Sequence, residues 1–155
     1  MKKILIIQSR KRPEMIAAEQ GEYTRATEGQ AELTFVSSLD DTLDWEQPQH
    51  MLENIGGVIL IAPWMVLSIE NLDKDEPPET AKPWLETPID FNKVISHSKK
   101  FVGIFSDNDK FVPLIENETL LKEKLGAKTI ILHNKGHFTE ENNITELPEV
   151  LSELL

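Results

Sequence analysis

The stretch that decides the fold is KFVGIF at residues 100–105, followed directly by SDNDKFVP at 106–113. Its apolar residues are hardly interrupted by polar ones, which is typical of a β-strand that is covered on both faces. Four other apolar runs rich in Ile, Val, Leu and Phe occur in the chain: KILII (3–7), AELTFV (31–36), GGVILIA (56–62) and AKTIIL (127–132). The sequence therefore predicts five short strands.

Helical patterns fill the intervals between these strands. Pro13 and Glu14 favour a helix start, with proline in the first position and an acid in the first turn, and this helix is predicted to continue to about Thr27. Further helices are predicted over 45–54, 79–85, 90–96, 113–125 and 146–155. The alternation of strands and helices predicts an α/β fold with a three-layer, doubly wound parallel sheet. The simplest strand order is the flavodoxin-like order 2-1-3-4-5, and residues 1–155 suit a single domain.

The composition restricts the classes of partner and site. Lys and Arg total 16 and Asp and Glu total 27, so the net charge is −11. An acidic chain without a basic stripe is a poor candidate for binding nucleic acid or an anionic membrane. The absence of cysteine excludes disulfides, thiolate metal sites and a cysteine nucleophile. No apolar run is long enough for a signal-peptide core or a membrane span, so we expect a cytoplasmic protein.

An acid and a base follow the last two predicted strands. Asp109 lies in SDNDKFVP, and His137 lies in NKGHF at residues 134–138. Because the carboxyl ends of parallel strands share one edge of the sheet, this placement suits an acid that orients an imidazole, as in a serine hydrolase. The alternative is structural: Asp109 starts a turn or caps the next helix, and His137 is a loop histidine. Asp107 competes with Asp109 for the role of the acid.

A nucleophilic serine is harder to find. The usual nucleophile elbow has the pattern G-x-S-x-G between a strand and a helix, and no serine here has those surroundings. Ser9 and Ser106 are the candidates because each follows a predicted strand directly. Neither has flanking glycines that would permit the sharp turn or bring backbone amides close to an oxyanion.

Other polar clusters suggest little further chemistry. Arg10, Lys11 and Arg12 precede a predicted helix and are a candidate site for a small anion, although a solvated charge cluster is the simpler interpretation. His50, His97 and His133 show no metal-ligand spacing, so the sequence predicts no metal site and no cofactor.

The second part of the chain resembles a known family. The stretches GGVILIAPW, EKLGAKTIILHNKGHFTEEN and EPPETAKPWLETPIDFNKVISHSKKFVGIFSDNDKFVP are similar to the small serine hydrolases related to retinoblastoma-binding protein 9. This resemblance covers residues from about 56 to 155. It implies an α/β-hydrolase-like domain, with Asp109 as the acid of a catalytic triad and His137 as its base.

The first part resembles a different family. ILIIQSRKRPEMIAAEQGEY and LDWEQPQHMLENIGGVIL are similar to the start of class I glutamine amidotransferase-like domains. That resemblance implies a flavodoxin-like strand order, but the cysteine nucleophile of those enzymes has no counterpart here. The two resemblances divide the chain into residues 1 to about 58 and about 59 to 155.

Three hypotheses follow from these observations. The first, favoured by the missing elbow and the change of resemblance, is a chimeric α/β scaffold, engineered or recombined, without catalytic activity. In it, Asp109 and His137 remain from a serine hydrolase whose nucleophile-bearing strand is lost. The second is a small serine hydrolase, an esterase, that uses a displaced serine. The third is a module that binds a small anion near Arg10, Lys11 and Arg12.

Overall fold

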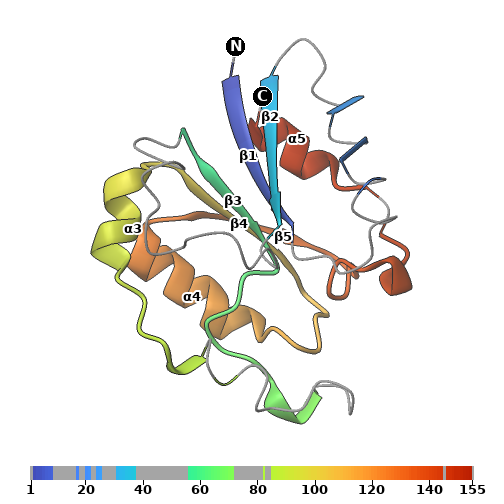
Figure 1. Cartoon of the computed structure of the whole chain (residues 1–155). Coiled ribbons are helices and arrows are strands. Elements are labelled where there is room, and N and C mark those ends of the chain that lie inside the picture. The colour runs from blue at the N-terminus through green and yellow to red at the C-terminus, as the bar shows by residue number, and fades with distance from the viewer. Residues whose placement is uncertain are drawn as a thin grey trace. The chain divides into compact units, whose positions relative to one another are not determined.

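The structure, a computed structural model, describes residues 2–8, 17, 20–21, 24–25, 31–37, 56–71, 82, 85–144 and 146–154. The chain divides into two compact units. The first comprises Met1–Glu53 with Leu154–Leu155, and the second comprises Asn54–Glu153. Each unit contains one parallel sheet (Figure 1).

The sheet of the first unit consists of two strands. β1 (Lys2–Gln8) and β2 (Ala31–Ser37) run parallel, with Lys2 opposite Ala31 and Gln8 opposite Ser37. Parallel neighbours need a crossover connection, which is commonly a helix. The described residues between the two strands are all helical: Ala17, Gln20, Gly21, Thr24 and Arg25. They lie within the helix predicted to run from Pro13 to about Thr27.

The sheet of the second unit has the order β3-β4-β5. β3 (Val58–Ile61), β4 (Phe101–Ser106) and β5 (Lys128–Leu132) are parallel. All six residues of the central strand β4 are buried, in agreement with its nearly uninterrupted apolar sequence. β4 therefore forms the middle of the described core and fixes the position of the loop that follows Ser106.

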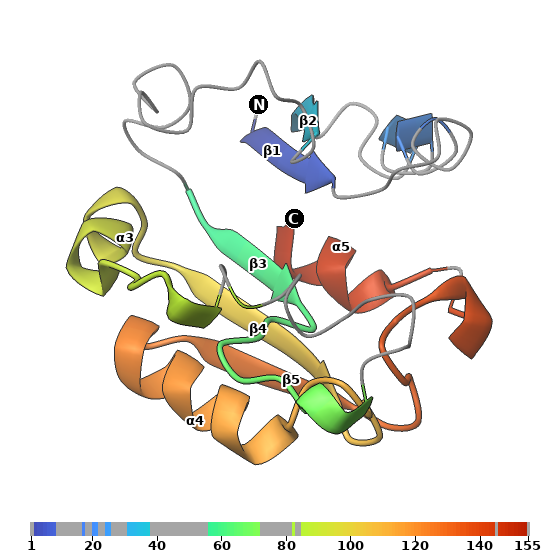
Figure 2. The ribbon, with the colours of Figure 1, turned by 60° about the horizontal axis from the view of Figure 1, so that its bottom comes forward.

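Helices cover both faces of this sheet. Figures 1 and 2 show α3 (Phe91–His97) and α4 (Leu114–Leu125) on one face and α5 (Pro148–Leu154) on the other. Two short 3-10 turns complete the elements, η2 (Ile69–Asn71) and η3 (Glu140–Asn142). The side chain of Glu153 forms ion pairs with Lys100 and Lys128, which attaches α5 to residues at the amino ends of β4 and β5.

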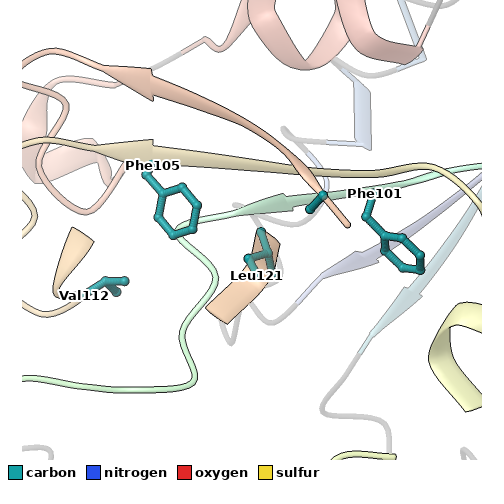
Figure 3. Packing of buried hydrophobic residues seen from close by; sticks show 5 residues of the cluster. Phe101, Phe105, Val112 and Leu121 are labelled. Atoms are coloured by element: carbon teal, nitrogen blue, oxygen red, sulfur yellow. The ribbon is translucent and has the colours of Figure 1, made fainter. Parts of the chain in front are cut away.

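Close packing between β4 and α4 depends on a glycine. A Cβ atom at Gly103 would lie 2.2 Å from Cδ2 of Leu121, which is fully buried. The contact belongs to a core cluster of Phe101, Phe105, Val112, Leu121 and Ala127. Figure 3 shows side chains of this cluster, with the aromatic rings coming from β4 and Leu121 from α4. Since interiors are packed at nearly crystalline density, a side chain at position 103 would have to displace the side chain of Leu121.

A buried amide connects α4 to the segment after β3. Asn117 is 0% exposed, and its Oδ1 accepts hydrogen bonds from the backbone N–H groups of Met65 (2.7 Å) and Val66 (3.0 Å). Its Nδ2 donates to the carbonyls of Val66 (2.9 Å) and Pro113 (2.8 Å). All four hydrogen-bonding positions of the amide are thus satisfied, as a buried polar group requires.

These observations confirm the predicted α/β class and its parallel strands. The described strand pairings do not join β1 to β3, so the five-strand order 2-1-3-4-5 stays a prediction. The helix predicted over 45–54 lies outside the described residues. No helix in the described part of the chain has the length and apolar character needed to cross a membrane.

Candidate active site

The candidate site lies at the carboxyl ends of two neighbouring strands. β4 ends at Ser106 and β5 ends at Leu132, and these two residues are paired across the sheet. The N–H of Asp107 still donates to the carbonyl of Leu132 at 3.1 Å. Consequently, the loops that follow the two strands leave the same edge side by side, where open α/β sheets place their ligands.

Asp109 uses its two carboxylate oxygens for different purposes. Oδ1 accepts hydrogen bonds from the backbone N–H groups of Phe111 (2.9 Å) and Val112 (3.2 Å), which shapes the turn before α4. Oδ2 lies 2.8 Å from Nδ1 of His137. The side chain of Asp109 is only 2% exposed. The structural and catalytic interpretations of this residue are thus compatible, because one oxygen folds the loop and the other holds the imidazole.

The environment keeps this carboxylate ionised. Burial by itself raises the pKa of Asp109, but the hydrogen bond with His137 and those from Phe111 and Val112 outweigh burial. The pKa of Asp109 therefore lies below its ordinary value. An ionised carboxylate accepts a hydrogen bond from Nδ1–H, so the neutral imidazole of His137 carries its proton at Nδ1 and has its unprotonated nitrogen at Nε2. That nitrogen can act as a general base.

The backbone around His137 is held by side chains as well. The N–H of His137 donates to Oδ1 of Asn142 at 2.9 Å. Gly136 has φ +54°, and a Cβ atom there would lie 2.4 Å from Cγ of Asn142. The ring of Phe111 meets the imidazole edge to face, with centroids 5.3 Å apart. The imidazole is thus fixed through both its ring and its backbone, while its side chain is still 33% exposed.

Asp107 forms a second pair with a different histidine. Its Oδ2 lies 2.6 Å from Nδ1 of His133, and its Oδ1 accepts a hydrogen bond from the backbone N–H of Asn134 at 2.9 Å. These contacts, first that from Asn134 and then that from His133, lower the pKa of Asp107. The side chain of His133 is 83% exposed and that of Asp107 is 35% exposed. Asp107 and Asp109 therefore do not compete for one imidazole, since each has its own partner.

Ser106 is fully engaged in contacts between the two loops. Its hydroxyl donates a hydrogen bond to Oδ1 of Asn108 at 2.8 Å and accepts one from the backbone N–H of Lys135 at 3.0 Å. The residue is 2% exposed. Its hydrogen bonds thus go to Asn108 and Lys135, not to the imidazole of His137. The other candidate serine, Ser9, lies outside the described residues, as do Arg10, Lys11 and Arg12.

Two asparagines were missed by sequence reasoning. Asn108 and Asn142 each present a side-chain oxygen to the loop that carries His137. Asn108 lies between two acids in SDND, but nothing in a local pattern indicates which backbone groups an amide will bind. Among the described residues, no three acidic or histidine side chains gather in a way that could hold a metal ion.

Comparisons with known proteins connect this geometry to a family. The family model described as "Serine hydrolase" matches residues 32–155. Among solved structures, the ydeN gene product from B. subtilis is similar at 18% identity with a TM-score of 0.74, covering 99% of this chain and 97% of that one. This likeness shows a shared fold. A comparison with curated protein sequences finds no significant match.

These findings correct the favoured hypothesis from the sequence. The family match begins at residue 32, well before the supposed junction near residue 58, and continues through it to the end of the chain. The fold match extends over nearly the whole chain. The prediction of a chimeric scaffold without activity is therefore wrong, and nothing supports the resemblance to glutamine amidotransferases. The missing elbow misled because it is one local motif, whereas the family match rests on most of the sequence.

Proposed function

Because the chain belongs to the serine hydrolase family, we propose that it hydrolyses small esters, with His137 as the general base and Asp109 as the acid that orients it. The observation that carries this proposal is the 2.8 Å contact between Oδ2 of a buried Asp109 and Nδ1 of His137. This contact holds the ring in one tautomer and orientation, and it stabilises the imidazolium that forms during the reaction.

The proposed reaction has two halves. Nε2 of His137 takes the proton of a serine hydroxyl as the serine oxygen attacks the ester carbonyl, and it then gives that proton to the departing alcohol. The acyl group is left on the serine. Water, deprotonated by the same nitrogen, then releases the carboxylic acid and restores the hydroxyl.

The nucleophile in this proposal is a serine that directly follows or ends a strand. The two candidates are Ser9, which follows Gln8, the last residue of β1, and Ser106, the last residue of β4. Ser106 is the weaker candidate because its hydroxyl already has two partners. Without the glycines of an elbow, we expect slow turnover.

A fluorophosphonate probe with mass-spectrometric identification of the labelled residue tests the proposal. We expect labelling on Ser9 that is lost in His137→Ala and in Ser9→Ala. The matched control is Ser152→Ala, since Ser152 lies on α5 and its hydroxyl bonds only to the carbonyl of Glu149 among the described contacts. A wild-type chain that neither reacts with the probe nor hydrolyses p-nitrophenyl esters would refute the proposal, and labelling on Ser106 would refute the choice of serine.

A further inference from the structure

The loop that carries His137 is held by hydrogen bonds to three consecutive backbone N–H groups. Lys135 N–H donates to Oγ of Ser106 at 3.0 Å, and Gly136 N–H donates to Oδ1 of Asn108 at 2.8 Å. His137 N–H donates to Oδ1 of Asn142 at 2.9 Å. Side-chain oxygens thus accept hydrogen bonds from three successive amides of this loop.

The first two of these acceptors form one unit. The hydroxyl of Ser106 donates to the same Oδ1 of Asn108 that accepts from Gly136, at 2.8 Å. Ser106 is the last residue of the fully buried strand β4, so its position is set by the core. Asn108 is in turn fixed by Ser106. The pair therefore transmits the position of β4 to the backbone directly before His137.

The loop needs such support because its backbone is unusual. Asn134, Gly136 and Phe138 have φ values of +57°, +54° and +54°. Residues other than glycine adopt this region at a cost, and such conformations persist only where surrounding contacts hold them. Asn134 and Phe138 therefore adopt conformations that depend on the surrounding contacts, whereas Gly136 adopts its conformation without steric cost.

We propose that Ser106 and Asn108 are positioning residues that set the location of the His137 imidazole, and that Ser106 is not a nucleophile; this inference rests on the proposed function of His137. The Ser106 hydroxyl has one proton, and that proton is used on Asn108. Attack on a substrate would require this bond to break, which would remove one of the contacts that hold Asn108 against the loop carrying the base.

Three variants test the role by kinetics. Ser106→Ala and Asn108→Ala should lower kcat for p-nitrophenyl esters by about ten- to a hundredfold while KM changes less than about twofold, because only the placement of the base is disturbed. Asn108→Asp keeps an oxygen that accepts from both Ser106 and Gly136, so it should recover most of the rate. Ser152→Ala provides the control, and melting temperatures identify any variant that has lost its fold.

A second readout does not depend on activity. In protein labelled with ¹⁵N-histidine, the His137 ring, assigned by its absence in His137→Ala, should show protonation at Nδ1 in the wild-type chain. In Ser106→Ala and Asn108→Ala, the two ring nitrogens should move toward averaged shifts, since a mobile ring exchanges between tautomers. Asn108→Asp should restore the wild-type spectrum.

The two readouts separate failure of this inference from failure of the proposed function. Wild-type kcat and an unchanged ring spectrum in Ser106→Ala would overturn the positioning role. Complete loss of probe labelling in Ser106→Ala, with an unchanged ring spectrum, would show instead that Ser106 is the nucleophile. An inactive wild-type chain would end the proposed function, and the ring spectrum of the variants would still decide whether Ser106 and Asn108 hold His137.

Discussion

The Asp109–His137 and Asp107–His133 pairs join the same two loops and differ in their surroundings. The Asp107–His133 contact is the shorter, at 2.6 Å against 2.8 Å, but its histidine is 83% exposed. The side chain of Asp109 is 2% exposed and carries three hydrogen bonds. An exposed ion pair contributes little because water screens it, whereas a buried carboxylate depends on each of its donors. Contact length is thus a poor guide to which pair does chemistry.

The largest expected difference between the pairs is in activity. Asp109→Asn should lower kcat/KM for ester hydrolysis by about 10³-fold or more, because an amide can hold His137 in the wrong tautomer and cannot stabilise an imidazolium. Asp107→Asn should stay within about threefold of the wild-type chain, since the Asp107 side chain contacts the ring of His133 instead. Equal losses of kcat/KM in the two variants, measured with the same p-nitrophenyl ester, would show that the two pairs do not differ in their contribution to activity.

The second difference is in stability. Asp109→Ala should lower the free energy of unfolding by about 3 kcal/mol, because the N–H groups of Phe111 and Val112 lose their acceptor in a buried turn. Asp107→Ala should shift the urea midpoint only slightly. Urea unfolding at neutral pH measures both variants, with Ser152→Ala as the control. A larger loss in Asp107→Ala than in Asp109→Ala would contradict this ranking.

A glycine in the same loop provides the third test. Gly136→Ala should cost about 2 kcal/mol, since alanine is strained at φ +54° and its Cβ would overlap the side chain of Asn142. Gly126→Ala is the matched control, because Gly126 also has a positive φ of 62° but no atom lies within 4 Å of its Cβ position. Thermal unfolding should show the larger loss of stability in Gly136→Ala. Equal losses in the two variants would mean that the Asn142 side chain can move aside at little cost.

Lowering the pH should have a smaller effect on the stability that Asp109 of the buried Asp109–His137 pair contributes. The folded protein lowers the pKa of Asp109, so the stability that its ionised form contributes is present above the ordinary carboxyl pKa of about 4 and is lost as pH falls through the lower folded value. The advantage of the wild-type chain over Asp109→Ala should therefore shrink as the pH is lowered below about 4. Urea midpoints of both proteins across this range measure it, and a growing advantage at low pH would have the wrong sign.

The smallest expected change in stability is at Asn134, whose N–H donates to Asp107 of the exposed Asp107–His133 pair. Asn134→Gly should stabilise the protein by about 0.5 kcal/mol, because glycine adopts φ +57° without the steric cost borne by asparagine. The N–H that donates to Asp107 is kept in this variant. Thermal unfolding should show a slightly higher melting temperature, and a clear decrease would mean that the Asn134 side chain has a role that its backbone does not explain.

Much of the second unit could be predicted from the sequence because its signals are local. The apolar run at 100–105 predicted a buried strand, and the helix predicted over 113–125 agrees with α4 to within one residue. Gly126 ends that helix, with φ +62° and a hydrogen bond from its N–H to the carbonyl of Lys122 at 2.9 Å. Strand periodicity and capping preferences act within a few residues, so one sequence suffices to read them.

The details of the candidate site could not be read in the same way. The sequence placed Asp109 and His137 at one edge of the sheet but left Asp107 as a rival acid. Separating them requires the direction of each side chain, which depends on contacts between residues 26 to 28 positions apart. The role of Asn142 depends on a turn that brings it back onto the backbone of His137. Non-local hydrogen bonds of this kind leave no periodic trace in a sequence.

The double use of Asp109 affects how relatives of this protein should be interpreted. A lineage that lost its hydrolytic activity would still be selected to keep an aspartate here, because the turn before α4 depends on it. The side chain of His137 supplies one of the three hydrogen bonds to Asp109 and packs against Phe111, so the fold depends on it less than on the aspartate. Retention of the acid alone is therefore uninformative about activity, and replacement of the histidine is the change that would identify a pseudoenzyme among its descendants.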